Sequence, residues 1–433
     1  MLRAFINAFK IPDLRRKLLF TLLIIAIYRL GSWIPLPGVD VGLLENVRAT
    51  QANNQIINVI NLFSGGALTA MALFALGIMP YITASIIMQL LNVVIPRLEQ
   101  LQREGEQGRR KITQYTRYAT VGLAVLQSTG LITLARNQSL FGVNVLPEAG
   151  TGEVVLIVLT LTAGTSMIMW LGELITQRGV GNGMSLIIYV AIISAFPSQL
   201  KIVFDQGQAN DFTFFGGWGL MSLVIILGVA LTLAVTFMEQ GQRRIPVQYA
   251  RRQVGRRTYG GQATYIPLKV NQSGVIPVIF ASSLLYLPVL LVSITGWGWM
   301  ETFVNNHINQ ISWVYITIFA SMTIFFAYFY TAIAFNPVEV ADNMKRYGGF
   351  IPGIRPGRQT AEYLDRVLTR ITLPGSFYLA TVTVIPFIIL AVFEIQAFPL
   401  GGISLLIMVG VALETMKQVE SQLMQRNYEG FLS

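Results

Sequence analysis

The chain has 433 residues, of which 53% are hydrophobic and 12% are charged, and its formal net charge is +10. The absence of cysteine excludes disulfides, thiolate chemistry and cysteine-bound metals, and the single histidine has no second imidazole with which to form a metal site. The apolar residues fall in long runs separated by short polar loops, a pattern typical of a polytopic helical membrane protein.

Ten apolar runs are long enough to be membrane spans, since a helix needs about 20 residues to cross a hydrocarbon core about 30 Å thick. The predicted spans are residues 18–36, 71–95, 118–134, 154–175, 184–204, 214–238, 274–294, 313–335, 371–392 and 399–416. No cleavable signal peptide is expected at the first span, because the run is too long and lacks a small-residue cleavage site. The predicted fold class is therefore all-α, with ten transmembrane helices.

Basic residues fall almost entirely on one side of these spans. Only Arg48, Arg136 and Lys201 fall in the loops of the other side, and Arg29 falls inside the first span. By the positive-inside rule, both termini and the loops with the remaining lysines and arginines are predicted to be cytoplasmic. Charge at membrane depth is costly, so Arg29 is interpreted either as a functional group or as a structural arginine that snorkels or pairs with carbonyls.

A short apolar piece precedes the second span. Residues 56–63 would form a helix of roughly 12 Å, too short to cross the membrane, and a Ser-Gly-Gly break follows at residues 64–66. The break frees backbone polar groups, which membrane depth tolerates only where protein buries them or water reaches them, so a half-span beside a cavity is predicted. The alternative is an interfacial segment before an ordinary helix that runs from Met71 and is kinked at Pro80.

Two predicted spans share a sequence pattern. Residues 77–85 and 274–282 both read Gly, two apolar residues, Pro, any residue, Ile, any residue, Ala, Ser. The two spans run in opposite directions on the predicted topology, as an inverted repeat of five-helix halves requires, and such a repeat places the working site between the halves. The predicted halves are residues 1–205 and 206–433, joined by a polar loop at residues 198–212.

Two cytoplasmic loops, at residues 239–272 and 336–370, are far longer than a helix connection requires. The first carries three arginine pairs with tyrosines interleaved, and the second is rich in glycine, proline and basic residues. Guanidinium groups can donate two hydrogen bonds at once to a phosphate or a carboxylate. These loops are therefore predicted to dock a phosphate backbone or an acidic protein surface. The alternative is that the basic residues only set the orientation of the protein in the membrane. That would explain the sign of the charge but not the length of the loops.

Catalytic and ion-coupling groups are missing from the sequence. No base lies beside a nucleophile and no phosphate loop or metalloprotease motif occurs, so neither catalysis nor a cofactor is expected. No acidic residue falls near the middle of a predicted span, whereas ion-coupled transporters usually keep such a group or a comparable polar site. The interpretation is a passive conduit driven by whatever docks on the basic loops. The alternative, a secondary transporter for a small solute, would share the ten spans and the inverted repeat.

Several short sequence motifs are distributed along the whole chain. They are residues 61–66 (NLFSGG), 74–82 (FALGIMPYI), 104–118, 178–183 (RGVGNG), 269–271 (KVN), 335–337 (FNP), 341–343 (ADN) and 352–357 (PGIRPG). Together these strings closely resemble the SecY family of protein-conducting channels. The resemblance implies two inverted five-helix halves around a central hourglass pore, with the half-span as a plug at about residues 56–66.

The resemblance also assigns roles to particular residues. The plug would consist of Ile57, Asn58, Ile60, Asn61, Leu62, Phe63, Ser64, Gly65 and Gly66, and the pore ring of Ile78, Ile82, Ile188, Ile279 and Ile407. Branched aliphatic side chains are stiff and form an apolar collar, which excludes ions yet offers no hydrogen bond to any particular peptide sequence. The polar seam of a lateral gate between the second and seventh spans would carry Thr83, Ser85, Gln89, Ser282 and Ser283.

The function and partners implied by the resemblance agree with a conduit. The chain would pass unfolded secretory polypeptides across the membrane and release transmembrane segments sideways into lipid. The SecA ATPase or the ribosome, including its RNA, would dock on Arg243, Arg244, Arg251, Arg252, Arg256, Arg257 and Arg355. SecE and SecG as partner subunits, signal peptides and nascent chains as substrates, anionic lipids, and an inner (plasma) or thylakoid membrane are implied as well.

Overall fold

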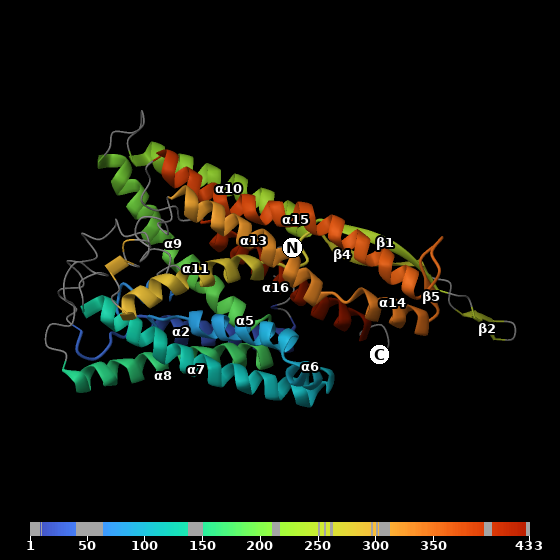
Figure 1. Ribbon diagram of the computed structural model, residues 1–433, viewed down its shortest axis with the longest axis horizontal. Coiled ribbons are helices and arrows are strands. Elements are labelled where there is room, and N and C mark those ends of the chain that lie inside the picture. The colour runs from blue at the N-terminus through green and yellow to red at the C-terminus, as the bar shows by residue number, and fades with distance from the viewer. Residues whose placement is uncertain are drawn as a thin grey trace.

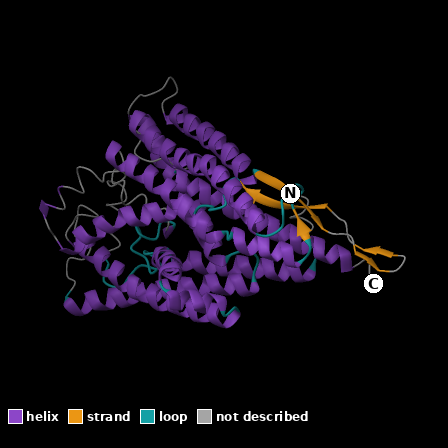
Figure 2. Cartoon of the chain, turned by 45° about the vertical axis from the view of Figure 1, so that its right-hand side comes forward, coloured by secondary structure: helices purple, strands orange, loops and turns teal. Residues whose placement is uncertain are grey.

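The helices lie along the long axis of the molecule, and the strands gather at one end (Figure 1, Figure 2). The computed structural model describes residues 9, 11–39, 64–136, 150–209, 217–249, 252–254, 257–259, 263–295, 298–299, 302, 312–393 and 401–429. Its helices are α2 (Pro12–Gly31), α5 (Met79–Val94), α6 (Pro96–Arg103), α7 (Glu106–Arg136), α8 (Thr151–Arg178), α9 (Gly183–Ala209), α10 (Gly217–Gln240), α11 (Ile276–Thr295), α13 (Trp313–Ala334), α14 (Pro337–Arg346), α15 (Arg358–Phe393) and α16 (Gly402–Glu429). Its strands are β1 (Gln242–Tyr249), β2 (Arg252–Val254), β3 (Arg257–Tyr259), β4 (Ala263–Lys269) and β5 (Gly349–Phe350).

Each predicted span overlaps one described helix, namely α2, α5, α7, α8, α9, α10, α11, α13, α15 or α16. Among the described residues, six helices are by themselves long and apolar enough to cross a membrane. Helices α5 and α6 form a further candidate span, bent by 99° between them. Length and composition therefore agree with the predicted polytopic class.

The second predicted span opens with turns instead of helix. The amide of Leu36 donates to the carbonyl oxygen of Met71 at 2.9 Å, and the amide of Leu73 donates to that of Ile34 at 2.8 Å. Because the segment after α2 occupies these backbone groups, they are not free to form helical hydrogen bonds. The expected helix from Met71 onward is therefore wrong, and α5 begins only at Met79.

Helix α9 continues past Pro197 without ending. The expected loop at residues 198–212 is therefore wrong over the part that α9 occupies. This extension packs on the start of α10: Phe204 meets Trp218 edge-on with ring centroids 5.0 Å apart, and a Cβ on Gly217 would lie 2.5 Å from the carbonyl oxygen of Phe204. Contact with α10 supports the extra turns, while the proline removes only one backbone donor.

The two long loops fold together into one module with a sheet that was not predicted. Strand β1 pairs antiparallel with both β4 and β5, giving the order β4-β1-β5, and Ile245 lies opposite Ile266. Ile245, Val247 and Leu268 are buried against residues of α14 and α15. Alternate side chains of a strand point to opposite faces, so the strand that buries Ile245 and Val247 leaves Arg244 exposed on its other face. Arg243, near the start of the strand, is exposed as well.

A larger apolar core lies among the long helices. Its buried members include Ile24 of α2, Ile188 of α9, Phe319 of α13 and Leu405 of α16. Residues from both predicted halves therefore contribute to one continuous cluster, although the boundary between the halves stays a prediction.

Candidate functional site

The two copies of the repeated pattern form the same local structure, because each one starts a helix. Gly77 and Gly274 precede α5 and α11 with φ of 56° and 62°, a left-handed conformation that suits glycine. Pro80 and Pro277 are the second residues of these helices, where a missing amide is tolerated, so the expected kink at Pro80 is wrong. Figure 1 shows α5 leading toward α6 at the end where the strands lie and α11 leading away from that end. The opposite directions agree with an inverted repeat.

The five isoleucines of the predicted ring belong to one hydrophobic cluster. They come from the start of α5 and from α9, α11 and α16: Ile78, Ile82, Ile188, Ile279 and Ile407. Ile279 is half-buried and the other four are buried. Four helices from both predicted halves thus bring stiff aliphatic side chains into one apolar core, which can close by packing and by excluding water. Their role as a constriction stays a prediction.

Only the last three residues of the predicted plug, Ser64, Gly65 and Gly66, are among the described residues; Ile57, Asn58, Ile60, Asn61, Leu62 and Phe63 lie outside them. We call residues 64–66 the exit turn. Gly65 and Gly66 have φ of 65° and 90°, and the hydroxyl of Ser64 accepts a hydrogen bond from the amide of Leu68 at 3.2 Å. The chain therefore reverses sharply here, as the Ser-Gly-Gly break predicts.

The predicted gate residues lie on α5 and α11, two helices that are in contact. The hydroxyls of Thr83 and Ser282 donate to carbonyl oxygens of their own helices. In contrast, the buried side-chain oxygens of Gln89 and Ser283 have no hydrogen-bond partner among the described residues. Ser85 is half-buried. Buried polar atoms without partners destabilise the arrangement that buries them, which suits a contact that must open.

Sequence reasoning missed Asn92, whose buried side-chain oxygen also lacks a partner among the described residues. It lies three residues after Gln89 on α5, and residues three apart share one face of a helix. The spacing of Ser85, Gln89 and Asn92 was a signal that could have revealed this polar stripe.

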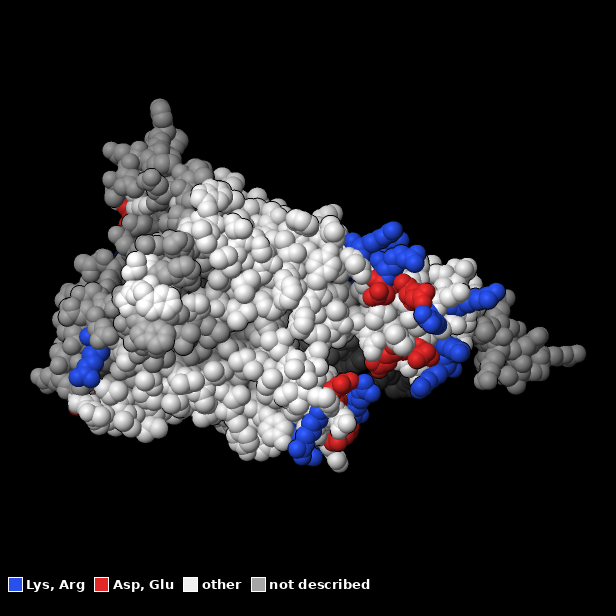
Figure 3. Space-filling model, viewed as in Figure 1, with Lys and Arg blue, Asp and Glu red and all other residues white. Residues whose placement is uncertain are grey.

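Three of the predicted docking arginines, Arg243, Arg244 and Arg355, are exposed. None of the ion pairs found in the described residues involves them. The backbone of Arg355 is fixed because its carbonyl accepts a hydrogen bond from the buried hydroxyl of Thr360 at 2.9 Å. Figure 3 shows basic side chains gathered toward the end of the molecule where the strands lie, interspersed with acidic side chains and next to a broad uncharged surface.

Two of the other predicted arginines, Arg252 and Arg257, belong to the hairpin of β2 and β3. Arg252 lies opposite Tyr259, and Arg257 lies opposite Val254. Arg251 and Arg256 lie outside the described residues. The described part of the loop therefore carries basic residues on two separate strand pairs.

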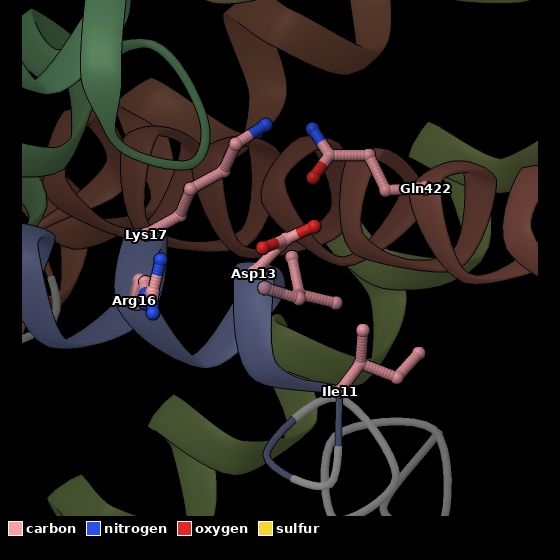
Figure 4. A pocket seen from close by; sticks show the side chains of 6 residues that line it. Ile11, Asp13, Arg16, Lys17 and Gln422 are labelled. Carbon is pink, nitrogen blue, oxygen red and sulfur yellow. The ribbon is translucent and has the colours of Figure 1, made fainter.

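A pocket of about 300 Å³ lies between the start of α2 and the end of α16 (Figure 4). It is lined by Ile11, Asp13, Leu14, Arg16, Lys17 and Gln422. None of the predicted ring or gate residues lines it, so this pocket is not the predicted working site.

Comparison with solved structures identifies the fold. A structure described as a protein conducting channel aligns with a TM-score of 0.64 at 16% identity, over 94% of this chain and 92% of that chain. Sec61 in the canine ribosome-channel complex from the endoplasmic reticulum aligns with a TM-score of 0.61 at 16% identity, over the same shares. The fold is therefore that of the protein-conducting channels.

Sequence comparison identifies the family. A profile described as SecY matches residues 72–416. The protein translocase subunit SecY of Streptomyces scabiei is 56% identical over 441 residues, which cover 100% of both chains. This chain belongs to the SecY family. The resemblance seen in the sequence strings is confirmed, and with it the all-α polytopic class.

Proposed function

We propose that this chain is the channel-forming subunit of a protein translocase and passes unfolded secretory polypeptides across a membrane. The observation that carries this proposal is the full-length identity of 56% with a curated protein translocase subunit. The arrangement of the five isoleucines supports it, because helices from both halves supply an apolar collar that can seal around any peptide. The ring seals the pore, and the half-span before the exit turn acts as its plug.

Transmembrane segments leave the channel between α5 and α11. The buried oxygens of Gln89, Asn92 and Ser283, which have no hydrogen-bond partner among the described residues, support this path, because a seam that buries such atoms is easier to open than an apolar one. The two halves, residues 1–205 and 206–433, move apart about the connection between α9 and α10. This motion exposes an apolar segment to lipid, where its side chains are more stable than in water.

The module built from the two long loops docks the partner that drives transport. Its exposed arginines can form paired hydrogen bonds with phosphates of ribosomal RNA or with carboxylates of the SecA ATPase. The similarity of the fold to a ribosome-bound channel supports the ribosome as the partner. SecE and SecG complete the complex, and anionic lipids surround it. The charge asymmetry of the sequence supports cytoplasmic termini in an inner (plasma) or thylakoid membrane.

Cysteine cross-linking tests the proposal, and the absence of native cysteines makes it clean. Single cysteines replace Ile82 and Ile279, and a secretory chain with one cysteine is stalled midway by a folded tail in membranes supplied with SecA and ATP. We expect ATP-dependent disulfides at both positions and none at Leu126→Cys, an exposed residue of α7. An engaged chain that cross-links at neither position contradicts a polypeptide pore and favours the small-solute transporter.

A further inference from the structure

Arg29 has a set of partners that the channel proposal does not use. Arg29 was expected to lie deep inside a longer span. It lies instead in the last turn of α2, because the helix ends at Gly31. Its Nη1 donates to the carbonyl oxygen of Gly65 at 3.0 Å and to the hydroxyl of Ser194 at 2.8 Å. One guanidinium therefore joins three segments: α2, the exit turn and α9.

The exit turn also packs directly on α9. A Cβ on Gly65 would lie 2.9 Å from the Ser194 hydroxyl and 3.0 Å from the Cα of Ala191. The Ser194 hydroxyl accepts from Arg29 and can donate to the carbonyl oxygen of Ala191 at 2.8 Å or to that of Gly65 at 3.4 Å. The turn is thus held both by close contact with α9 and by hydrogen bonding to a cation.

A second contact fixes α2 against the segment that follows the exit turn. The rings of Tyr28 and Phe74 stack with centroids 5.8 Å apart, and both residues are buried. A Cβ on Gly31 would lie 2.1 Å from the ring of Phe74. Since α2 is already positioned by this packing, Arg29 is not needed to hold the helix there. Its hydrogen bonds act on the exit turn instead.

The nature of the partners shows why the contact can be broken. None of the ion pairs found in the described residues includes Arg29, and its partners are a neutral carbonyl and a hydroxyl. Hydrogen bonds from an ionised donor are stronger than neutral ones, but two neutral acceptors hold a guanidinium less tightly than a buried carboxylate would. Such a contact holds a turn in place and still releases it without separating opposite charges.

We propose that Arg29 is a latch that ties the exit turn to α9 and keeps the resting channel sealed against ions. The proposal rests on the proposed function, because it assigns the latch to the half-span that plugs the pore. When the channel opens, Arg29 releases the carbonyl of Gly65, and the turn separates from α9.

Resting ion conductance tests the latch. The complete complex is purified with its partner subunits and reconstituted in planar lipid bilayers with potassium chloride and no secretory substrate. Loss of one charge-assisted hydrogen bond shifts a two-state equilibrium by at least about tenfold. Arg29→Met loses two such bonds and should raise the resting conductance by at least that factor. Ser194→Ala, which removes one partner, should raise it less, and Arg136→Met, an exposed cation at the end of α7, should leave it unchanged.

A disulfide can replace the latch. Gly65→Cys and Ser194→Cys place two thiols within the range that a disulfide spans. In the Arg29→Met background, oxidation with copper phenanthroline in air should return the conductance to the wild-type level, and dithiothreitol should raise it again. The same pair in the wild-type background controls for strain at Gly65, whose φ is positive.

Each outcome decides the proposal. A wild-type conductance in Arg29→Met complexes that still transport protein overturns the latch, and so does an increase that oxidation does not reverse. If Arg29→Met fails to accumulate in the membrane, Ser194→Ala decides, and an unchanged conductance there also overturns the latch. The cross-links at Ile82 and Ile279 are measured in the same preparations. Their absence contradicts the proposed function, whereas their presence with an unchanged leak contradicts only the latch.

Discussion

Replacing Gln89 by leucine should make the gate between α5 and α11 harder to open. The buried side-chain oxygen of Gln89 has no hydrogen-bond partner among the described residues. Leucine has a similar volume and no polar atom, so the closed arrangement loses an unsatisfied group and gains apolar contact. The open state, in which water or polypeptide can reach the side chain, gains no such benefit.

The size of the effect follows from the cost of that unpaired oxygen. A buried acceptor without a partner costs about 1–3 kcal/mol. One leucine in a transmembrane segment favours insertion by about 0.3–0.6 kcal/mol. The closed state should therefore be stabilised enough that a test segment needs about two to ten more leucines before half of it enters the membrane.

A graded series of leucine and alanine segments measures this threshold. Each segment is placed in a secreted reporter, and the inserted fraction is read by protease protection in cells that depend on the variant channel. Thr83→Val is the matched control, because the Thr83 hydroxyl already donates within its own helix at 3.0 Å. We expect the control to move the threshold by less than one leucine.

Two results would refute the reasoning. An unchanged threshold in Gln89→Leu would mean that the side chain does not take part in the gate. A threshold that falls would mean that the closed state gains from the amide, although its oxygen has no partner in the described part of the chain. Asn92→Leu should shift the threshold in the same direction as Gln89→Leu if the two residues form one polar stripe.

Three further predictions concern docking, packing and the ring. Arg355→Glu should abolish ATP-driven export while the channel still accumulates in the membrane, and normal export in purified vesicles would remove Arg355 from the docking site. Gly164→Ala should lower the melting temperature, because its Cβ would lie 2.2 Å from the carbonyl oxygen of Leu73, whereas Gly122→Ala meets nothing within 4 Å and should not; equal melting temperatures would contradict this. Ile279→Ser should raise the resting ion conductance more than Ile279→Val, and equal conductances would argue against an apolar seal.

The gate and ring residues were predicted from the family resemblance. The shared pattern at residues 77–85 and 274–282 lies at two helix starts, where glycine and proline impose backbone angles that need no distant partner, although the first of these helices was expected to run from Met71 with a kink at Pro80. The same pattern pointed to Ile82 and Ile279 as equivalent positions. The spacing of Asn92 from Ser85 and Gln89 was a local signal that went unused, whereas the absence of a hydrogen-bond partner for its buried oxygen among the described residues is visible only in the folded chain.

Contacts between distant segments could not be derived in this way. The pairing of Leu36 with Met71 replaced helix by turns, and the contact of Arg29 with Ser194 joined residues 165 positions apart. The two long loops formed one sheet only because β5 reaches β1 across several helices. These outcomes depend on which backbone groups and faces other segments occupy.

Composition and charge placement by themselves determined that this protein is a polytopic helical membrane protein, and its short sequence motifs determined its family. Hydrophobic run length and the cost of charge at membrane depth act residue by residue, so a sequence records them directly. The tertiary structure decided where helices begin, how the loops pair and what Arg29 holds, because each of these depends on hydrogen-bond partners that only the folded chain brings within reach.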